Sequence, residues 1–149
     1  MNDEKYMRLA LEQAKEAKAD GELPFGAVIV QGDKVIAENR CREGKEKNVT
    51  AHAELQAVSG ACDVLGRNKL QDCVIYCTNE PCTMCAAAIF QAKIPRVVIG
   101  ASREDLGHLL RARRLGISDV AEDSGYDIDI TRGVLKDDVL ALFADVVRD

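Results

Sequence analysis

The chain has 149 residues, 47% of them hydrophobic and 30% charged, and a formal net charge of −5. This length suits one ordinary domain with a core of its own and is too short for two. The acidic balance argues against a nucleic-acid partner, because non-specific affinity for phosphates comes from clustered Lys and Arg. The short basic cluster of Arg111, Arg113 and Arg114 is expected to be a solvated helix face.

The composition also bears on the compartment and on the six cysteines. No secretory stretch opens the sequence, and its apolar runs are shorter than the roughly 18–20 residues that span a bilayer. We therefore expect a soluble cytoplasmic protein, in which thiols stay reduced and cysteines serve as metal ligands, nucleophiles or core residues. Four cysteines are isolated, Cys41, Cys62, Cys73 and Cys77, and most of them are predicted to be small buried hydrophobes.

The first forty residues predict a helix followed by a hairpin. Apolar residues recur at helical spacing in a segment that opens at Asn2 or Asp3 and closes before Gly21. Two β-rich runs, AVIV at 27–30 and KVIAE at 34–38, then flank a Gly-Asp turn. This pattern is typical of two antiparallel strands.

The middle of the chain predicts two helices and two buried strands. The charged segment 41–50 lacks periodicity and is predicted to be a loop, whereas 51–65 has helical spacing. The apolar run 72–77 is expected to be a buried strand. Pro81 then stands where a helix of strong formers would begin, and 96–101 reads as another buried strand.

The last third predicts a helix at 103–115, a short strand within 126–130 and a final amphipathic helix in 136–149. Strands therefore alternate with helices after an initial hairpin. This order implies a five-stranded mixed sheet with helices on both faces, a three-layer α/β/α sandwich. No internal repeat or low-complexity linker interrupts it, so residues 1–149 are predicted to form one domain.

A C-x-x-C pair stands directly after Pro81. With Pro at the first helical position, Cys82 and Cys85 are expected on one face of the first turn. The N–H groups and dipole of a helix start stabilise thiolate, which is the form that binds zinc. His52, at the start of another predicted helix, supplies a third ligand. Three protein ligands leave one position open, as at a catalytic zinc.

The residues alone leave alternatives to an open zinc site. Cys77, or Cys73 further upstream, is a possible fourth ligand that would close the shell as in a structural site. A lone C-x-x-C is also compatible with a redox pair, and a lone His with a core residue. Glu54 favours the open site, since a carboxylate two residues beyond His52 can lie over the open position. There it can take a proton from water activated by zinc and return it to a leaving amine.

These residues carry a family resemblance. TAHAE at 50–54 and EPCTMC at 80–85 resemble the H-x-E…P-C-x-x-C signature of the cytidine deaminase superfamily. The resemblance implies a cytidine deaminase-like fold and one Zn²⁺ per subunit, bound by His52, Cys82 and Cys85. It also implies that Glu54 moves the proton while water attacks a ring carbon and ammonia leaves.

Further matches point to one branch of that superfamily. PFGAVIV at 24–30, Asn39 and the stretch 81–101 are similar to bacterial guanine deaminases, tRNA adenosine deaminases and fungal-type cytosine deaminases. The resemblance covers about residues 5–101. In this branch, the residue at the position of Asn39 hydrogen-bonds the substrate.

Other site residues follow from the same resemblance. Phe25 either packs against the flat base or is an ordinary core aromatic, and Ala53 leaves room for the ring and presents a backbone N–H. By likeness to guanine deaminases, Asp105 is expected to assist catalysis, with a helix cap or surface carboxylate as the alternative. His108 is expected on a helix surface.

The resemblance predicts deamination of a free nucleobase or nucleoside, with guanine slightly ahead of cytosine. A tRNA adenosine deaminase is the alternative, disfavoured by the acidic charge and by the segment that follows the fourth strand. A third alternative, from another functional class, is a non-catalytic binding module in which zinc only stabilises the fold. A second copy is the expected partner, as a homodimer. The C-terminal stretch 136–149 is a candidate cap for the pocket, with Asp145 and Asp149 as pocket acids or solvated carboxylates.

Overall fold

A computed structural model describes residues 2–147, so Asp149 lies outside the described part of the chain. Five strands form one mixed sheet in the order β2-β1-β3-β4-β5, which confirms the predicted sheet. β1 is antiparallel to β2 and β3, whereas β3, β4 and β5 run parallel. The bounds of the strands are β1 Gly26–Gln31, β2 Lys34–Arg40, β3 Cys73–Asn79, β4 Arg96–Ala101 and β5 Asp129–Thr131.

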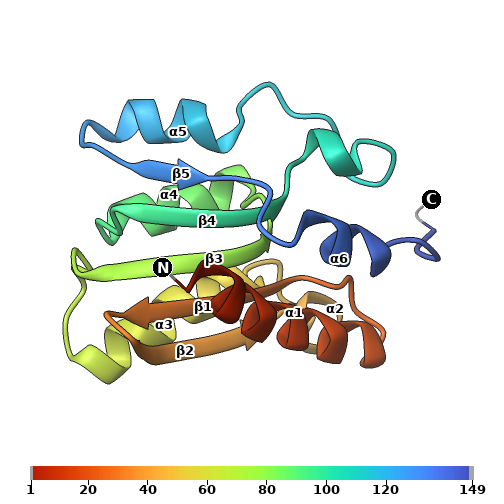
Figure 1. Ribbon diagram of the computed structural model, residues 1–149, viewed down its shortest axis with the longest axis horizontal. Coiled ribbons are helices and arrows are strands. Elements are labelled where there is room, and N and C mark those ends of the chain that lie inside the picture. Colours follow the sequence, from red (N-terminus) through yellow and green to blue (C-terminus); the bar gives the residue numbers. More distant parts are fainter. Residues whose placement is uncertain (1, 148–149) are drawn as a thin grey trace.

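Helices cover both faces of the sheet, as predicted (Figure 1). α1 (Asp3–Ala19) and α6 (Lys136–Ala141) pack on one face. α3 (Ala53–Leu65), α4 (Thr83–Gln91) and α5 (Ile117–Ser124) form the layer on the other face. The molecule is therefore a three-layer α/β/α sandwich.

Alternation along the strands divides the core between the two layers. In β1, Ala27 and Ile29 join the cluster under α3 and α4, whereas Val28 and Val30 join the cluster under α1. A strand's side chains alternate between its two faces, and both faces of β1 are buried. A one-residue slip in register would exchange the two sets, so the packing fixes where each strand ends and hence where the loops beyond it lie.

The segment 41–50 was predicted to be a loop, and this is wrong for its centre. A short helix, α2, spans Glu43–Glu46. Glu22, on the loop after α1, accepts hydrogen bonds from the backbone N–H groups of Gly44 (3.0 Å) and Lys45 (2.7 Å). This carboxylate accepts hydrogen bonds from two N–H groups at the helix start. Because Glu22 lies outside the segment, the pattern of residues within the segment could not predict this helix.

The predicted helix at 103–115 is also wrong. Only a single 3₁₀ turn forms there, at Glu104–Leu106, and the helix α5 begins later. Leu106 is the fully buried side chain of the segment, and the charged run after Leu110 offers no apolar face to pack. Gly116 instead opens α5, with the Asp119 carboxylate accepting the Gly116 N–H at 2.9 Å.

The last predicted helix is shorter than expected. α6 ends at Ala141, and the chain continues to Val146 through i to i+3 turns that keep Phe143 buried. Phe143 lies against Phe25, with ring centroids 5.8 Å apart. Within residues 2–147, no helix is both long enough and apolar enough to cross a membrane.

Candidate active site and metal centre

Two helices begin at the same place in the molecule. His52 is the N-cap of α3, and Cys82 is the N-cap of α4, both with extended backbone. The prediction that Pro81 is the first helical residue is wrong, because Pro81 precedes the cap. Cys85 still falls in the first turn of α4, so both thiols lie at the helix start.

The three predicted ligands lie together. His52 Nδ1 is 3.7 Å from Cys82 Sγ and 3.3 Å from Cys85 Sγ, and the three ligand atoms lie within 4.8 Å of one another. Tetrahedral zinc with bonds of about 2.3 Å to sulfur and 2.0–2.1 Å to nitrogen places its ligand atoms roughly 3.5 Å apart. The donor set therefore fits a tetrahedral metal. Within residues 2–147, neither Cys73 nor Cys77 joins this cluster, so these ligands leave one position open.

The second ring nitrogen of His52 has its own partner. His52 Nε2 lies 3.2 Å from a carboxylate oxygen of Glu43, in the short helix α2. This contact turns Nδ1 toward the two sulfur atoms, in the way that carboxylates orient metal-binding histidines. Sequence reasoning missed Glu43, because the surrounding segment was predicted to be a loop.

The pKa values of the two thiols are shifted in opposite directions. A hydrogen bond from the Cys85 thiol, supported by His52, lowers the pKa of Cys82 to about 3. The same contact with Cys82, followed by burial, raises the pKa of Cys85. The hydrogen bond to Cys82 raises the pKa of His52 against the effect of burial. These surroundings favour the thiolate form of Cys82, which is the form of cysteine that binds a metal.

Glu54 lies in the first turn of α3 and is 8% exposed. Burial raises the pKa of Glu54 to about 7, and the charge of Cys82 adds to this rise while His52 opposes it. A carboxyl whose pKa lies near neutrality can both accept and donate a proton. The predicted base therefore lies next to the predicted ligands with suitable electrostatics.

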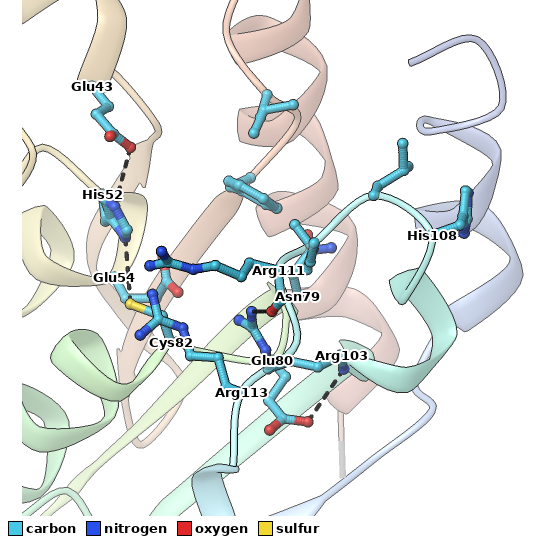
Figure 2. A pocket seen from close by; sticks show the side chains of 14 residues that line it. Glu43, His52, Glu54, Asn79, Glu80, Cys82, Arg103, His108, Arg111 and Arg113 are labelled. Carbon is cyan, nitrogen blue, oxygen red and sulfur yellow. Dashed lines mark hydrogen bonds and ion pairs between the residues drawn. The ribbon is translucent and has the colours of Figure 1, made fainter. Parts of the chain in front are cut away.

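A cavity of about 680 Å³ opens over this centre (Figure 2). His52, Glu54 and Cys82 form part of its wall. A volume of this order is typical of small-molecule sites. The rest of the wall comes from the loop before β1, α2, the end of β3 and the segment after β4; these residues are Leu23, Phe25, Glu43, Asn79, Glu80, Arg103, His108, Leu109, Leu110, Arg111 and Arg113.

Three predicted substrate-binding residues occupy different surroundings. Phe25 lines the cavity and also packs on Phe143. Asn39 is half-buried in β2, paired with Ala27 of β1, and does not belong to the cavity wall. Ala53, the first residue of α3, is completely buried behind the wall. Of the three, the structure brings the Phe25 side chain to the cavity.

Asp105 lies outside the cavity wall, in the 3₁₀ turn after β4. One carboxylate oxygen accepts the Ser102 N–H at 2.9 Å, and the other lies 3.0 Å from Lys136 Nζ. The Ser102 N–H holds the pKa of Asp105 below its ordinary value, with Lys136 assisting. These contacts correspond to the helix-cap alternative, and a catalytic role for Asp105 stays a prediction.

The basic cluster and His108 were predicted on a helix surface, and this is wrong. Arg111, Arg113 and His108 belong to the non-helical segment after β4 and line the cavity together with Arg103. Figure 2 shows the Arg111 and Arg113 side chains extending across the cavity toward the side that carries Glu54 and Cys82. Among residues 2–147, none of the three arginines forms an ion pair with a carboxylate.

A buried carboxylate holds the segment that carries these residues. The Glu80 side chain is 4% exposed and lies 3.0 Å from Arg132. It also accepts the backbone N–H of Arg103 (3.4 Å) and of Ile117 (3.0 Å). One carboxylate therefore ties both ends of the segment to the residue before Pro81. Sequence reasoning treated Glu80 only as part of a motif.

Comparisons with known proteins give a consistent result. A family model described as MafB19-like deaminase matches residues 1–137. The tRNA-specific adenosine deaminase of Agrobacterium fabrum (strain C58) is 46% identical over 96 residues, which cover 64% of this chain and 63% of that protein. The chain thus spans less than two thirds of that relative. The guanine deaminase of Bacillus subtilis (strain 168) is 41% identical over 106 residues, or 70% of this chain and 68% of that protein.

The fold has close counterparts among solved structures. One structure, from biochemical and structural studies of A-to-I editing by tRNA:A34 deaminases, superposes with a TM-score of 0.79 at 33% identity. The superposition covers 93% of this chain and 98% of that one. The similar proteins thus include deaminases of a free base and of a base in tRNA.

Proposed function

This chain belongs to the MafB19-like deaminase family, and from that premise we propose that it catalyses zinc-dependent hydrolytic deamination of a nucleobase or nucleoside. The observation that carries the proposal is Glu54, a buried carboxylate on the wall of the cavity that also holds the His52, Cys82 and Cys85 cluster. A zinc staple without chemistry has no need of a buried base beside an open coordination position.

His52, Cys82 and Cys85 are proposed to hold the metal, since their spacing and donor types fit tetrahedral zinc. When bound, zinc supplies an activated water nucleophile at neutral pH. Glu43 holds the His52 ring, and the start of α4 favours the thiolate form of both cysteines.

Glu54 is proposed to move the proton. Its carboxylate accepts a proton from the water that attacks the ring carbon and returns it to the amino group bonded to that carbon. A C–O bond forms, the C–N bond breaks and ammonia leaves. The remaining proton of the new hydroxyl moves to the adjacent ring nitrogen, so the product is a ring carbonyl. Burial of Glu54 keeps bulk water from competing for that proton. Phe25, which also lines the cavity, offers an aromatic face to a flat heterocycle.

Among free substrates, we place guanine slightly ahead of cytosine. The similarity to the B. subtilis guanine deaminase supports this order. We also propose that residues 1–149 act as one deaminase domain and that two copies associate as a homodimer. The cysteines are free in the structure, and a site built on reduced thiols suits a reducing compartment such as the cytoplasm.

Adenosine in tRNA is the second candidate substrate. The tRNA-specific adenosine deaminase of A. fabrum supports it, and so does the position of Arg103, Arg111 and Arg113 on the cavity wall. Arginines without carboxylate partners at the mouth of a site are suited to contact phosphates. The overall negative charge is therefore a weak argument against a nucleic-acid substrate, because three arginines lie on the wall of the cavity itself.

The proposal is tested by ammonia release from the zinc-loaded protein with guanine, cytosine, adenine, their nucleosides and tRNA. We expect turnover of at least one substrate, and we expect Glu54→Ala to lower kcat by roughly 10²- to 10⁴-fold while retaining one zinc. Glu122→Ala, at an exposed position of α5, is the control. The proposal fails if the wild type and Glu54→Ala behave alike on every substrate while both hold the metal.

A further inference from the structure

Asn79, the last residue of β3, combines burial with an unused hydrogen-bond donor. The residue is 5% exposed, and its side-chain nitrogen Nδ2 is buried without a hydrogen-bond partner among residues 2–147. Buried side-chain polar groups in folded proteins are nearly always paired, because an unpaired one loses its hydration without compensation. Such a group next to a cavity indicates a partner that arrives from outside the chain.

The orientation of the Asn79 amide is fixed by its neighbours. The Gly26 backbone N–H donates to Thr78 Oγ1 at 3.0 Å. The Thr78 hydroxyl in turn donates to Asn79 Oδ1 at 2.8 Å, a shorter contact than its alternative of 3.3 Å to the Gly26 carbonyl. The amide oxygen is thereby engaged, and the NH₂ group is the free end of the side chain.

The residue that carries this NH₂ group lines the same cavity as the proposed base. Asn79 lines the cavity with Glu54, His52 and Cys82, and Figure 2 labels it among the side chains of that wall. Asn79 directly precedes Glu80 and Pro81, so β3 and the start of α4 hold its backbone on both sides. A donor held in this way can bind its partner with little loss of conformational entropy.

We propose that Asn79 Nδ2 donates a hydrogen bond to an acceptor atom of the heterocycle in this cavity, a carbonyl oxygen or an unprotonated ring nitrogen, and so determines which bases are bound. This inference rests on the proposed deaminase function and names a recognition group for it. A site that hydrogen-bonds one position of its substrate discriminates strongly against analogues that lack the matching group there.

Two variants remove the donor in different ways. Asn79→Asp keeps the size of the side chain and an oxygen for the Thr78 hydroxyl, but replaces the NH₂ donor with an acceptor. Asn79→Leu keeps the number of non-hydrogen side-chain atoms, although its methyl groups are bulkier, and it carries no charge, so it covers the case in which a new carboxylate beside Glu54 disturbs the centre. Asn68→Asp is the matched control, because Asn68 is exposed and lies outside the cavity wall.

Calorimetric titration of the zinc-loaded proteins with guanine, cytosine, adenine and 2,6-diaminopurine measures affinity without requiring turnover. We expect the base that the wild type binds most tightly to lose roughly 10- to 100-fold in affinity in both Asn79 variants. Asn68→Asp should match the wild type. We further expect Asn79→Asp to shift preference from guanine, which has a carbonyl oxygen at ring position 6, toward 2,6-diaminopurine, which has an amine there.

The outcomes separate this inference from the proposed function. Affinities of both Asn79 variants within about twofold of the Asn68→Asp control would overturn the recognition role, even if deamination proceeds. The absence of binding of any of the four bases to the wild type would overturn it as well. If the wild type binds a base and the Asn79 variants lose it while no substrate is turned over, the donor is supported and the deaminase proposal fails.

Discussion

His52 faces two sulfur atoms with one ring nitrogen and the Glu43 carboxylate with the other. A histidine that binds metal through one nitrogen depends on the group that holds its second nitrogen, because that contact sets both the tautomer and the angle of the ring. Glu43 provides it from α2, whose start is capped by Glu22. Glu22, far from His52 in the sequence, therefore supports the helix that holds the His52 ring at the proposed metal centre.

We predict that Glu43→Gln weakens zinc binding by about tenfold or more, because the neutral amide orients the His52 ring less firmly. Competition with a chromophoric chelator measures the affinity. Glu46→Gln is the control, since Glu46 belongs to the same helix, is exposed and is absent from the cavity wall. Equal zinc affinities of the two variants would contradict an orienting role for Glu43.

At the scale of single residues, the sequence predicts those site residues that belong to a local sequence pattern. His52, Cys82 and Cys85 follow from spacing and helix starts, and the structure brings them together. Glu43 and Asn79 do not follow, because their roles arise from contacts between segments that are distant in the sequence. A lone Glu in a charged segment and a lone Asn at a strand end carry no periodic signal.

At the scale of elements, α1 approaches β1 so closely that a side chain is excluded between them. A Cβ on Gly26 would lie 2.1 Å from the carbonyl oxygen of Ala10 and 2.7 Å from the nitrogen of Ala14. Both contacts are with backbone atoms, so the neighbours have no flexible side chain to move aside. The glycine therefore sets the distance between the helix and the sheet, next to Phe25 on the cavity wall.

We predict that Gly26→Ala lowers the free energy of unfolding by about 3 kcal/mol, since α1 must shift away from the sheet. Gly60→Ala is the matched comparison. Its Cβ would meet only ordinary contacts, the nearest at 3.7 Å, so alanine should stabilise the interior of α3 by about 0.5–1 kcal/mol. Urea unfolding followed by circular dichroism measures both. Similar unfolding midpoints for the two variants would disprove the close-packing argument.

The elements that sequence reasoning placed correctly have strong local signals. The strands β1, β3 and β4 are runs of β-branched residues between turns, and α1 has an uninterrupted apolar stripe. The segment after β4 has neither. By propensity, the arginines of this segment are compatible with a helix. The hydrogen bonds of Glu80 to both ends of the segment and the start of α5 after Gly116 instead hold the segment as a loop on the cavity wall.

At the scale of the whole molecule, one ion-pair group joins the N-terminal helix to the far half of the sheet. The Asp3 carboxylate, in the first turn of α1, lies 2.7 Å from Arg96 of β4. The Arg96 guanidinium also lies 3.3 Å from Asp129 of β5. Three elements, α1, β4 and β5, therefore share one partly buried contact, and its strength depends on the charge of Asp3.

We predict that this contact makes stability depend on acidity. The hydrogen bond from Arg96 holds the pKa of Asp3 below its ordinary value of 3.8. Because the folded-state pKa is the lower one, the stabilisation is fully present above pH 3.8 and is lost as the pH falls through the folded-state value. Asp3→Asn should therefore cost about 1 kcal/mol near neutral pH, and the difference from the wild type should shrink below about pH 4.

Urea unfolding between neutral and acidic pH measures this difference. Asp127→Asn is the control, because Asp127 is exposed in the loop before β5 and makes no ion pair among the described residues. A constant difference between the wild type and Asp3→Asn across the pH range would contradict the linkage. The same would hold if Asp127→Asn reproduced the pH dependence of Asp3→Asn.

Glu80 binds the N–H groups of Arg103 and Ile117, so both ends of one segment close on a single carboxylate. The residues between those anchors leave and return at the same point, while the proposed metal ligands and the proposed base lie at the starts of α3 and α4. This geometry makes the segment exchangeable: its length and composition can be altered, in evolution or by grafting, with the reaction centre left in place. Related proteins that catalyse the same reaction can in this way differ in substrate, because the sequence of this segment can change while its two ends stay anchored.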